Sequence, residues 1–215
     1  MVIVGAAGFG RETLDVVAAI GEASPEWEVR GVVDDGPSTA NLARLAARGV
    51  RYLGTVESFL SGPADGWFVV GVGSPAVRRR LDQRLTSAGL RAATLIHPSA
   101  TVGVGARIGR GSIVCAGVAV STCVELGEHV HLNPHATIGH DSRLESYVSV
   151  NPGAIISGDC VVRSGTLVGA GAVILQGLEV GSDVVVGASA CVTRSVPAGV
   201  VVKGVPGRWV EPSPR

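Results

Sequence analysis

The chain has 215 residues, with 18 basic and 18 acidic side chains, so its formal net charge is zero. Neither half carries a basic run, and we therefore expect no nucleic-acid partner and no anionic membrane surface, because both rely on an excess of positive charge. The chain opens without a charged and apolar leader and has no apolar stretch of membrane-spanning length, so a cytoplasmic protein is expected.

Residues 1–94 predict a parallel α/β domain of Rossmann type. An apolar strand at residues 2–4 leads through a glycine-rich turn into apolar residues at helical spacing. Further strands are predicted at 29–33 and 67–73, and a helix from 75 to 88 follows the later strand. Strands that alternate with helices indicate a parallel sheet, which binds ligands at the carboxyl ends of its strands.

Two short motifs fall at this predicted ligand-binding edge. Gly5, Gly8 and Gly10 follow the first strand, where glycine lets the backbone approach a phosphate at a helix N-terminus. Their spacing is GxxGxG and not the dinucleotide fingerprint GxGxxG, so a simple tight turn also explains them. Asp34 and Asp35 end the second strand, where they hold a ribose or base edge or else form a solvated turn.

Residues 95–215 predict a parallel β-helix. Every sixth residue from Ile96 to Val192 is Ile, Leu or Val, at seventeen consecutive positions, and the residue four later is nearly always small. Such a period indicates a solenoid in which three short strands make one triangular coil of about 18 residues. Glycine or asparagine often follows the aliphatic residue, and we expect positive φ there, at the coil corners. No insertion interrupts the period, so any site must be built from faces and corners.

This period resembles that of the left-handed β-helix acyltransferases, the hexapeptide-repeat family. The opening GAAGFGRE, a strand ending in DD, a strand ending in GVGSP and the entry LIHP further resemble the sugar acetyltransferases grouped with sialic-acid O-acetyltransferase and the UDP-4-amino-sugar N-acetyltransferases. The resemblance implies a left-handed β-helix, a homotrimer with active sites between subunits, and an α/β domain that binds a nucleotide-sugar substrate. The substrate-binding residues that it implies are Gly8, Phe9, Gly10, Asp34, Asp35, Gly73, Ser74 and Asn133.

His140 and Asp141 match the family's His-Asp or His-Glu motif, in which the histidine is the general base and the carboxylate orients it. His140 lies two residues after the inward-facing Ile138, which places it at a corner of the β-helix. The residue one coil later is Gly158, and we expect the missing side chain to leave space for a thioester.

The resemblance also implies acetyl-CoA as the acyl donor and no metal. The cofactor-binding residues that it implies are Ser149, Gly158, Ala170, Ala188, Lys203 and Arg208. Ser149 stands where relatives commonly have a cofactor-contacting histidine. The segment 203–208 resembles the family's segment near the CoA nucleotide, with Gly207 in place of alanine.

The sequence thus predicts an acetyl-CoA-dependent N-acetyltransferase that acts on a nucleotide-linked amino sugar by direct transfer. O-acetylation of a sialic-acid-like sugar is the alternative, and a trimer that binds a nucleotide sugar without catalysis is another. His135 and His140 also have the spacing of two zinc ligands in the carbonic anhydrases built on the same β-helix. The position equivalent to the third ligand is Ser99, which speaks against such a zinc lyase.

Overall fold

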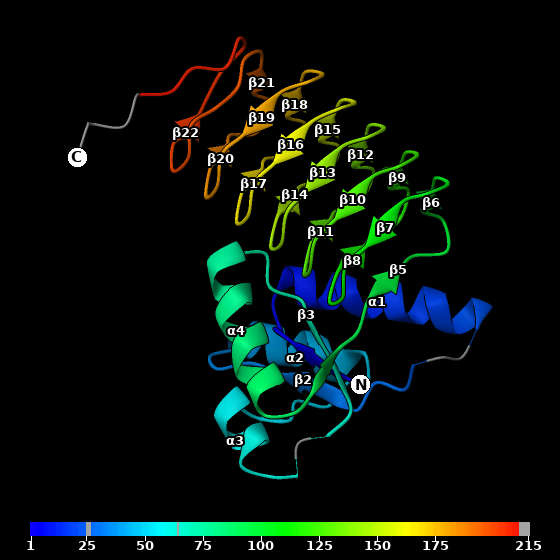
Figure 1. Ribbon diagram of the computed structural model, residues 1–215. Helices are drawn as coiled ribbons and strands as arrows, with labels where there is room; N and C mark the ends of the chain where they lie inside the picture. Colours follow the sequence, from blue (N-terminus) through cyan, green and yellow to red (C-terminus); the bar gives the residue numbers. More distant parts are fainter. Residues whose placement is uncertain (25–26, 64, 211–215) are drawn as a thin grey trace. The chain divides into compact units, whose positions relative to one another are not determined.

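The computed structural model describes residues 1–24, 27–63 and 65–210. The chain divides into two compact units, Met1–Pro98 and Ser99–Arg215 (Figure 1). The division falls four residues after the predicted boundary at 94/95, because strand β5 (Leu95–Ile96) groups with the first unit. Within the described residues, no helix is long and apolar enough to cross a membrane.

The first unit is a parallel sheet with the strand order β2-β1-β3-β4, accompanied by helices. Its strands are β1 (Val2–Val4), β2 (Gly31–Val33), β3 (Trp67–Val70) and β4 (Arg91–Ala92). Its helices are α1 (Gly8–Ala23), α2 (Thr39–Ala47), α3 (Val56–Leu60) and α4 (Pro75–Ser87). The predicted α/β fold is confirmed, whereas the short helices α2 and α3 were not predicted, although each begins after a hydroxyl cap, Ser38 and Thr55 respectively.

Continuous apolar strands build the sheet because both of its faces are buried. Val4 pairs with Val33 on β2 and with Val70 on β3, and all three side chains are at most 2% exposed. Helix α1 contacts β1, and α4 contacts β3 and β4. The chain therefore leaves β1, β2 and β3 at one edge of the sheet, and the strand order reverses between β1 and β3, which is where open α/β sheets bind ligands.

The second unit is a parallel β-helix whose coils stack in chain order (Figure 1). One face consists of β7 (Arg107–Ile108), β10 (Glu125–Leu126), β13 (Arg143–Leu144), β16 (Val161–Val162) and β19 (Glu179–Val180). A second face contains β8 (Ile113–Val114), β11 (His131–Leu132), β14 (Ser149–Val150), β17 (Leu167–Val168), β20 (Val185–Val186) and β22 (Val201–Val202). The third consists of β6 (Thr101–Val102), β9 (Ala119–Val120), β12 (Thr137–Ile138), β15 (Ile155–Ile156), β18 (Val173–Ile174) and β21 (Cys191–Val192).

The six-residue period sets the interior of this β-helix, as predicted. Ile138 and Leu144 are 0% exposed, and so is Ala154 at one of the small positions. Ile96 and Val102 are 38% and 43% exposed, because the aliphatics that open the period have a coil stacked on only one side.

The prediction of positive φ directly after the aliphatic residue is wrong. Positive φ recurs two residues later in the corner, for example at Gly105, Gly111 and Asp141. The glycines that follow the aliphatic have a different cause, close approach between coils. A Cβ at Gly109 would lie 2.3 Å from the carbonyl oxygen of Gly127, one coil later.

Candidate active site

A cavity of about 380 Å³ lies at the carboxyl edge of the sheet in the first unit. Its wall includes Phe9, Asp34, Asp35 and Gly73, four of the predicted substrate residues, together with apolar side chains of α3 and α4. The strand order places it at the switch point between β1 and β3. The turns after three different strands thus meet in one cavity, as expected for a ligand site of this fold.

The two aspartates differ in how much of each carboxylate is already used. Asp34 accepts hydrogen bonds through both oxygens, from the amide of Ala6 at 2.8 Å and from the amide of Gly36 at 2.9 Å. Asp35 accepts one backbone bond, from Val56 at 2.8 Å. Asp34 therefore ties the turn after β1 to the turn after β2, and Asp35 keeps more capacity to accept a bond from a ligand.

The glycines near this cavity differ in whether a side chain would fit at their position. A Cβ at Gly10 would lie 1.9 Å from the carbonyl oxygen of Gly5, so Gly10 is needed for the close packing of α1 on the turn. A Cβ at Gly8 would meet nothing within 4 Å. Gly8, Gly10 and Ser74 are absent from the cavity wall, so their predicted contact with the substrate is not supported.

Sequence reasoning missed Arg78, a fully buried cation on α4. Its guanidinium Nη1 donates to the carbonyl oxygens of Val72 and Gly73 at 3.0 and 3.3 Å, and both of these residues line the cavity. Arg78 therefore fixes the turn after β3. Its position in an arginine-rich helix gave no sign in the sequence that it points inward.

His140 and Asp141 lie together at the corner that follows β12 in the β-helix. Nδ1 of His140 is 2.7 Å from Oδ2 of Asp141, and the two side chains are 54% and 58% exposed. Because a carboxylate only accepts hydrogen bonds, Nδ1 carries the proton in this pair and the neutral ring presents a lone pair at Nε2. Asp141 has φ of 59°, a conformation that aspartate tolerates. The pair thus has the geometry of an oriented, accessible base.

Gly158 lies against this imidazole, and the expected space for a thioester is not there. A Cβ at Gly158 would lie 2.5 Å from Nε2 of His140, and the glycine itself is buried. The histidine ring occupies the volume that the missing side chain leaves. The ring of His140 leans along the β-helix axis toward the following coil, which brings it against Gly158. The sequence alone does not predict this direction.

The remaining predicted residues of the β-helix lie on other corners or faces. Ala170 and Ala188 are exposed at the corner after β17 and β20, one face away from the corner of His140. Asn133 is 9% exposed and donates from Nδ2 to the carbonyl oxygen of Val150 at 2.9 Å. Ser149 on β14 is 1% exposed, and this burial does not support its predicted contact with the cofactor.

A second cavity, of about 680 Å³, lies near the C-terminal end of the described chain. Lys203 and Arg208 both line it, next to Trp209. The backbones of Lys203 and Arg208 form an antiparallel bridge, with both N–H to carbonyl distances at 2.9 Å. This bridge brings the two cations to one groove, and their contacts with phosphates stay a prediction.

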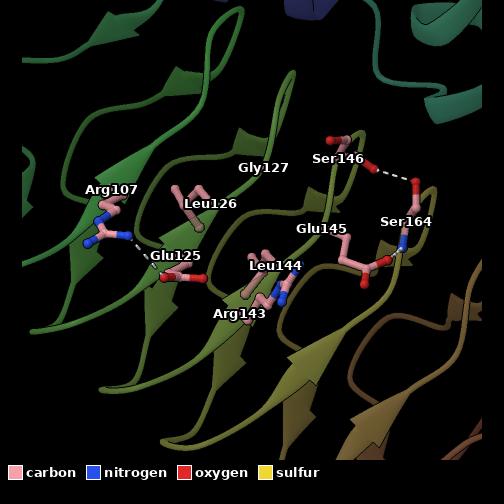
Figure 2. A pocket seen from close by; sticks show the side chains of 9 residues that line it. All are labelled: Arg107, Glu125, Leu126, Gly127, Arg143, Leu144, Glu145, Ser146 and Ser164. Atoms are coloured by element: carbon pink, nitrogen blue, oxygen red, sulfur yellow. Dashed lines mark hydrogen bonds and ion pairs between the residues drawn. The ribbon is translucent and has the colours of Figure 1, made fainter.

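Figure 2 shows a third cavity, of about 440 Å³, on the face formed by β7, β10 and β13. Two of its carboxylates are paired with arginines: Glu125 lies 3.6 Å from Arg107, and Glu145 lies 2.8 Å from Arg163, which stands beside the cavity. Although burial raises the pKa of Glu145, hydrogen bonds from Arg163 and from the backbone of Ser164 outweigh it and hold that pKa below its ordinary value. These pairs link successive coils, and His140 is not part of this cavity.

The zinc-ligand spacing of His135 and His140 is not accompanied by a third ligand among the described residues. Within residues 1–24, 27–63 and 65–210, no group of three or more His, Cys, Asp or Glu side chains is arranged to hold a metal ion. Ser99, at the position of the missing third ligand, accepts a hydrogen bond from the amide of Gly117 at 3.1 Å. His140 is instead paired with Asp141.

The family model of the PglD N-terminal domain matches residues 1–85. GDP-perosamine N-acetyltransferase of Escherichia coli O157:H7 is 32% identical over 147 residues, which are 67% of this chain and 64% of that protein. The matched region is thus somewhat less than two thirds of that relative's length.

Two solved structures resemble nearly the whole chain. Perosamine N-acetyltransferase from Caulobacter crescentus, in complex with CoA and GDP-perosamine, has a TM-score of 0.87 and 28% identity, covering 98% of this chain and 96% of its own. The acetyltransferase domain of PglB from Neisseria gonorrhoeae has a TM-score of 0.82 and 30% identity, covering 97% and 98% respectively. The chain therefore belongs to the N-acetyltransferase family that joins a PglD-type N-terminal domain to a hexapeptide-repeat β-helix.

Proposed function

We propose that this protein is an acetyl-CoA-dependent N-acetyltransferase that acts on a nucleotide-linked amino sugar. The observation that carries the proposal is the His140–Asp141 pair, a base with a fixed tautomer exposed at a corner of the β-helix. The relative from Escherichia coli is a GDP-perosamine N-acetyltransferase, and the Caulobacter structure contains CoA and GDP-perosamine. Both support an amino sugar linked to a nucleotide diphosphate as the substrate class.

The residues of the pair supply proton transfer and orientation. Acetyl-CoA, when bound, supplies the acetyl group as a thioester. The sugar amine has to lose a proton as it attacks, and Nε2 of His140 accepts that proton. Asp141 holds the proton on Nδ1 and stabilises the imidazolium that results. No serine or cysteine nucleophile is needed, so transfer is direct: the new C–N bond forms at the sugar amine, the thioester C–S bond breaks, and the CoA thiolate leaves with the proton that His140 took from the amine.

The residues present fit a CoA molecule. Lys203 and Arg208 are exposed cations on one groove of about 680 Å³, and the ring of Trp209 lies beside them. Guanidinium and ammonium groups are the usual protein partners of phosphates. Lys203 and Arg208 would therefore hold the phosphates of CoA, at some cost in affinity when salt is raised.

We also propose a homotrimer. In one chain, His140 lies at the corner after β12, whereas Ala170 and Ala188 lie at the corner after β17 and β20. Corners of a triangular coil point in different directions, so one chain cannot bring both sets to one ligand. Two neighbouring subunits can do so, and three such contacts close a ring.

Residues 1–94 would then serve as the nucleotide-sugar domain, with the cavity around Asp35 and Phe9 as the nucleotide site. The cavity has both apolar walls and a carboxylate with spare acceptor capacity, which suits a base and its N–H groups. We place the enzyme in the cytoplasm, because acetyl-CoA and nucleotide sugars are cytoplasmic metabolites.

The test is a substrate panel. Purified protein would be incubated with acetyl-CoA and UDP-, TDP- and GDP-linked 4-amino sugars, with release of CoA and the product mass measured. The matched control is the same nucleotide sugar with a hydroxyl in place of the amine. We expect acetylation of at least one amine and not of its hydroxyl counterpart. Transfer to the hydroxyl compound would favour O-acetylation, and tight binding without transfer would favour the non-catalytic alternative.

A further inference from the structure

Gly158 breaks a pattern in the corners of the β-helix. Two residues after each aliphatic, from Val104 to Ala188, the sequence has fifteen positions, and Gly158 is the only glycine among them. The other fourteen are Val104, Arg110, Ala116, Thr122, Glu128, Pro134, His140, Ser146, Pro152, Ser164, Ala170, Gln176, Ser182 and Ala188. The single exception falls one coil after His140.

The backbone does not require glycine at this position. The φ angle of Gly158 lies outside the left-handed region, whereas Gly153 has φ of 66°. Alanine occupies the equivalent corner position at Ala116 and Ala170, so a methyl group is compatible with this turn. The cause must therefore lie in what surrounds Gly158.

The imidazole of His140 fills that surrounding space. A Cβ at Gly158 would lie 2.5 Å from Nε2, 2.6 Å from Cε1 and 3.0 Å from Cδ2 of His140. Contacts this short cannot exist, so the ring would have to turn away. The His140 side chain is 54% exposed, so turning its ring away would cost the fold little stability. It would, however, break the 2.7 Å contact between Nδ1 and Asp141.

We propose that Gly158 is a positioning residue, whose lack of a side chain holds the imidazole of His140 in register with Asp141. Nε2 then keeps its lone pair available, because no side chain at position 158 pushes the ring away from Asp141. The proposal rests on the proposed role of His140 as the base. It assigns Gly158 a role in catalysis through the histidine, which is separate from the predicted backbone contact of Gly158 with the cofactor.

The test compares Gly158→Ala in two backgrounds of the full-length protein. In the wild-type background we expect kcat to fall about 10²-fold, the cost of misplacing a catalytic group by about 1 Å, with KM for both substrates and the thermal midpoint little changed. In the His140→Ala background the same substitution should cost nothing further. Gly21→Ala is the matched control, since its added methyl meets nothing within 4 Å, and it should keep the wild-type kcat.

Three results would overturn the proposal. These are an unchanged kcat for Gly158→Ala, an equal loss in both backgrounds, and a loss seen only as a higher KM for acetyl-CoA, which would indicate a cofactor contact. A spectroscopic measurement distinguishes failure of the positioning role of Gly158 from failure of the proposed role of His140 as the base. The downfield proton resonance of Nδ1–H bonded to Asp141 should be present in wild type and lost in Gly158→Ala, even if His140→Ala proves active. Its persistence in Gly158→Ala would refute the positioning role.

Discussion

Replacing Asp34 with asparagine should destabilise the first unit, because both carboxylate oxygens of Asp34 hold backbone amides. The amides belong to Ala6 and Gly36, at 2.8 and 2.9 Å. Asparagine keeps one oxygen and puts an NH₂ group in place of the other, so one of the two amides faces a donor. A hydrogen bond to a charged group contributes about 1.5–3 kcal/mol, and we expect a loss of stability of about that size.

Asp35→Asn is the control for this change. Among the described residues, only one oxygen of Asp35 accepts a backbone bond, and the oxygen that asparagine retains can preserve it. The other oxygen lies 3.8 Å from Arg84, in a pair whose side chains are about half exposed. Such pairs contribute about 0–1 kcal/mol, so Asp35→Asn should be far milder in stability.

Urea unfolding followed by tryptophan fluorescence measures this difference. In a Trp209→Phe background the signal comes from Trp27 and Trp67, which pack edge to face in the first unit at 5.6 Å. We expect a lower midpoint for Asp34→Asn and a near-normal one for Asp35→Asn. If Asp34→Asn unfolds with the wild-type midpoint while KM for the sugar rises, Asp34 acts as a ligand to the substrate and the structural reasoning is wrong.

Val186→Asp should unfold the β-helix, because a fully buried valine contributes about 1.5–3 kcal/mol and a buried carboxylate costs several kcal/mol more. The control is Val185→Asp, since Val185 is 41% exposed, and this variant should melt near the wild-type temperature when followed by circular dichroism. Equal melting temperatures for the two variants would disprove the assignment of Val186 to the interior. Lys203→Ala should raise KM for acetyl-CoA several-fold at low salt and less at about 1 M salt, where the Debye length is about 3 Å; a salt-independent effect would contradict a phosphate contact. Iodoacetamide should label the exposed Cys123 in the folded protein and should label Cys160 only after urea is added, as measured by peptide mass spectrometry. The reason is that burial shields the Cys160 thiol and raises its pKa. Rapid labelling of Cys160 in the native state would contradict its burial.

The interior of the β-helix was predictable because a six-residue period commits the same side of every strand to the core. Ile138 and Leu144 are both fully buried, as the period requires. The pairing of His140 with Asp141 was expected from the resemblance to the family's His-Asp motif, and the structure places Nδ1 2.7 Å from Oδ2. These features depend on local sequence and on a repeat that copies one geometry many times.

Features that depend on the next coil were harder to predict. The sequence shows glycine in two corner positions. Only the structure separates Gly109, where a side chain would clash with the following coil, from Gly105, where the backbone has positive φ. The His140 ring fills the space beside Gly158, and no spacing in the sequence encodes the direction of that ring. The two internal bonds of Asp34 were equally hidden, because they join turns 28 and two residues away in sequence.

The kcat of His140→Ala tests the central claim most directly. It would be measured with an accepted nucleotide amino sugar and saturating acetyl-CoA, and acetyl-CoA affinity would be measured separately by calorimetry. If His140 is the general base, kcat should fall by about 10²–10⁴, the usual contribution of general acid–base catalysis, while acetyl-CoA affinity is largely retained. A variant that kept more than about half of the wild-type kcat, or accumulation of an acetylated enzyme, would contradict direct transfer through His140.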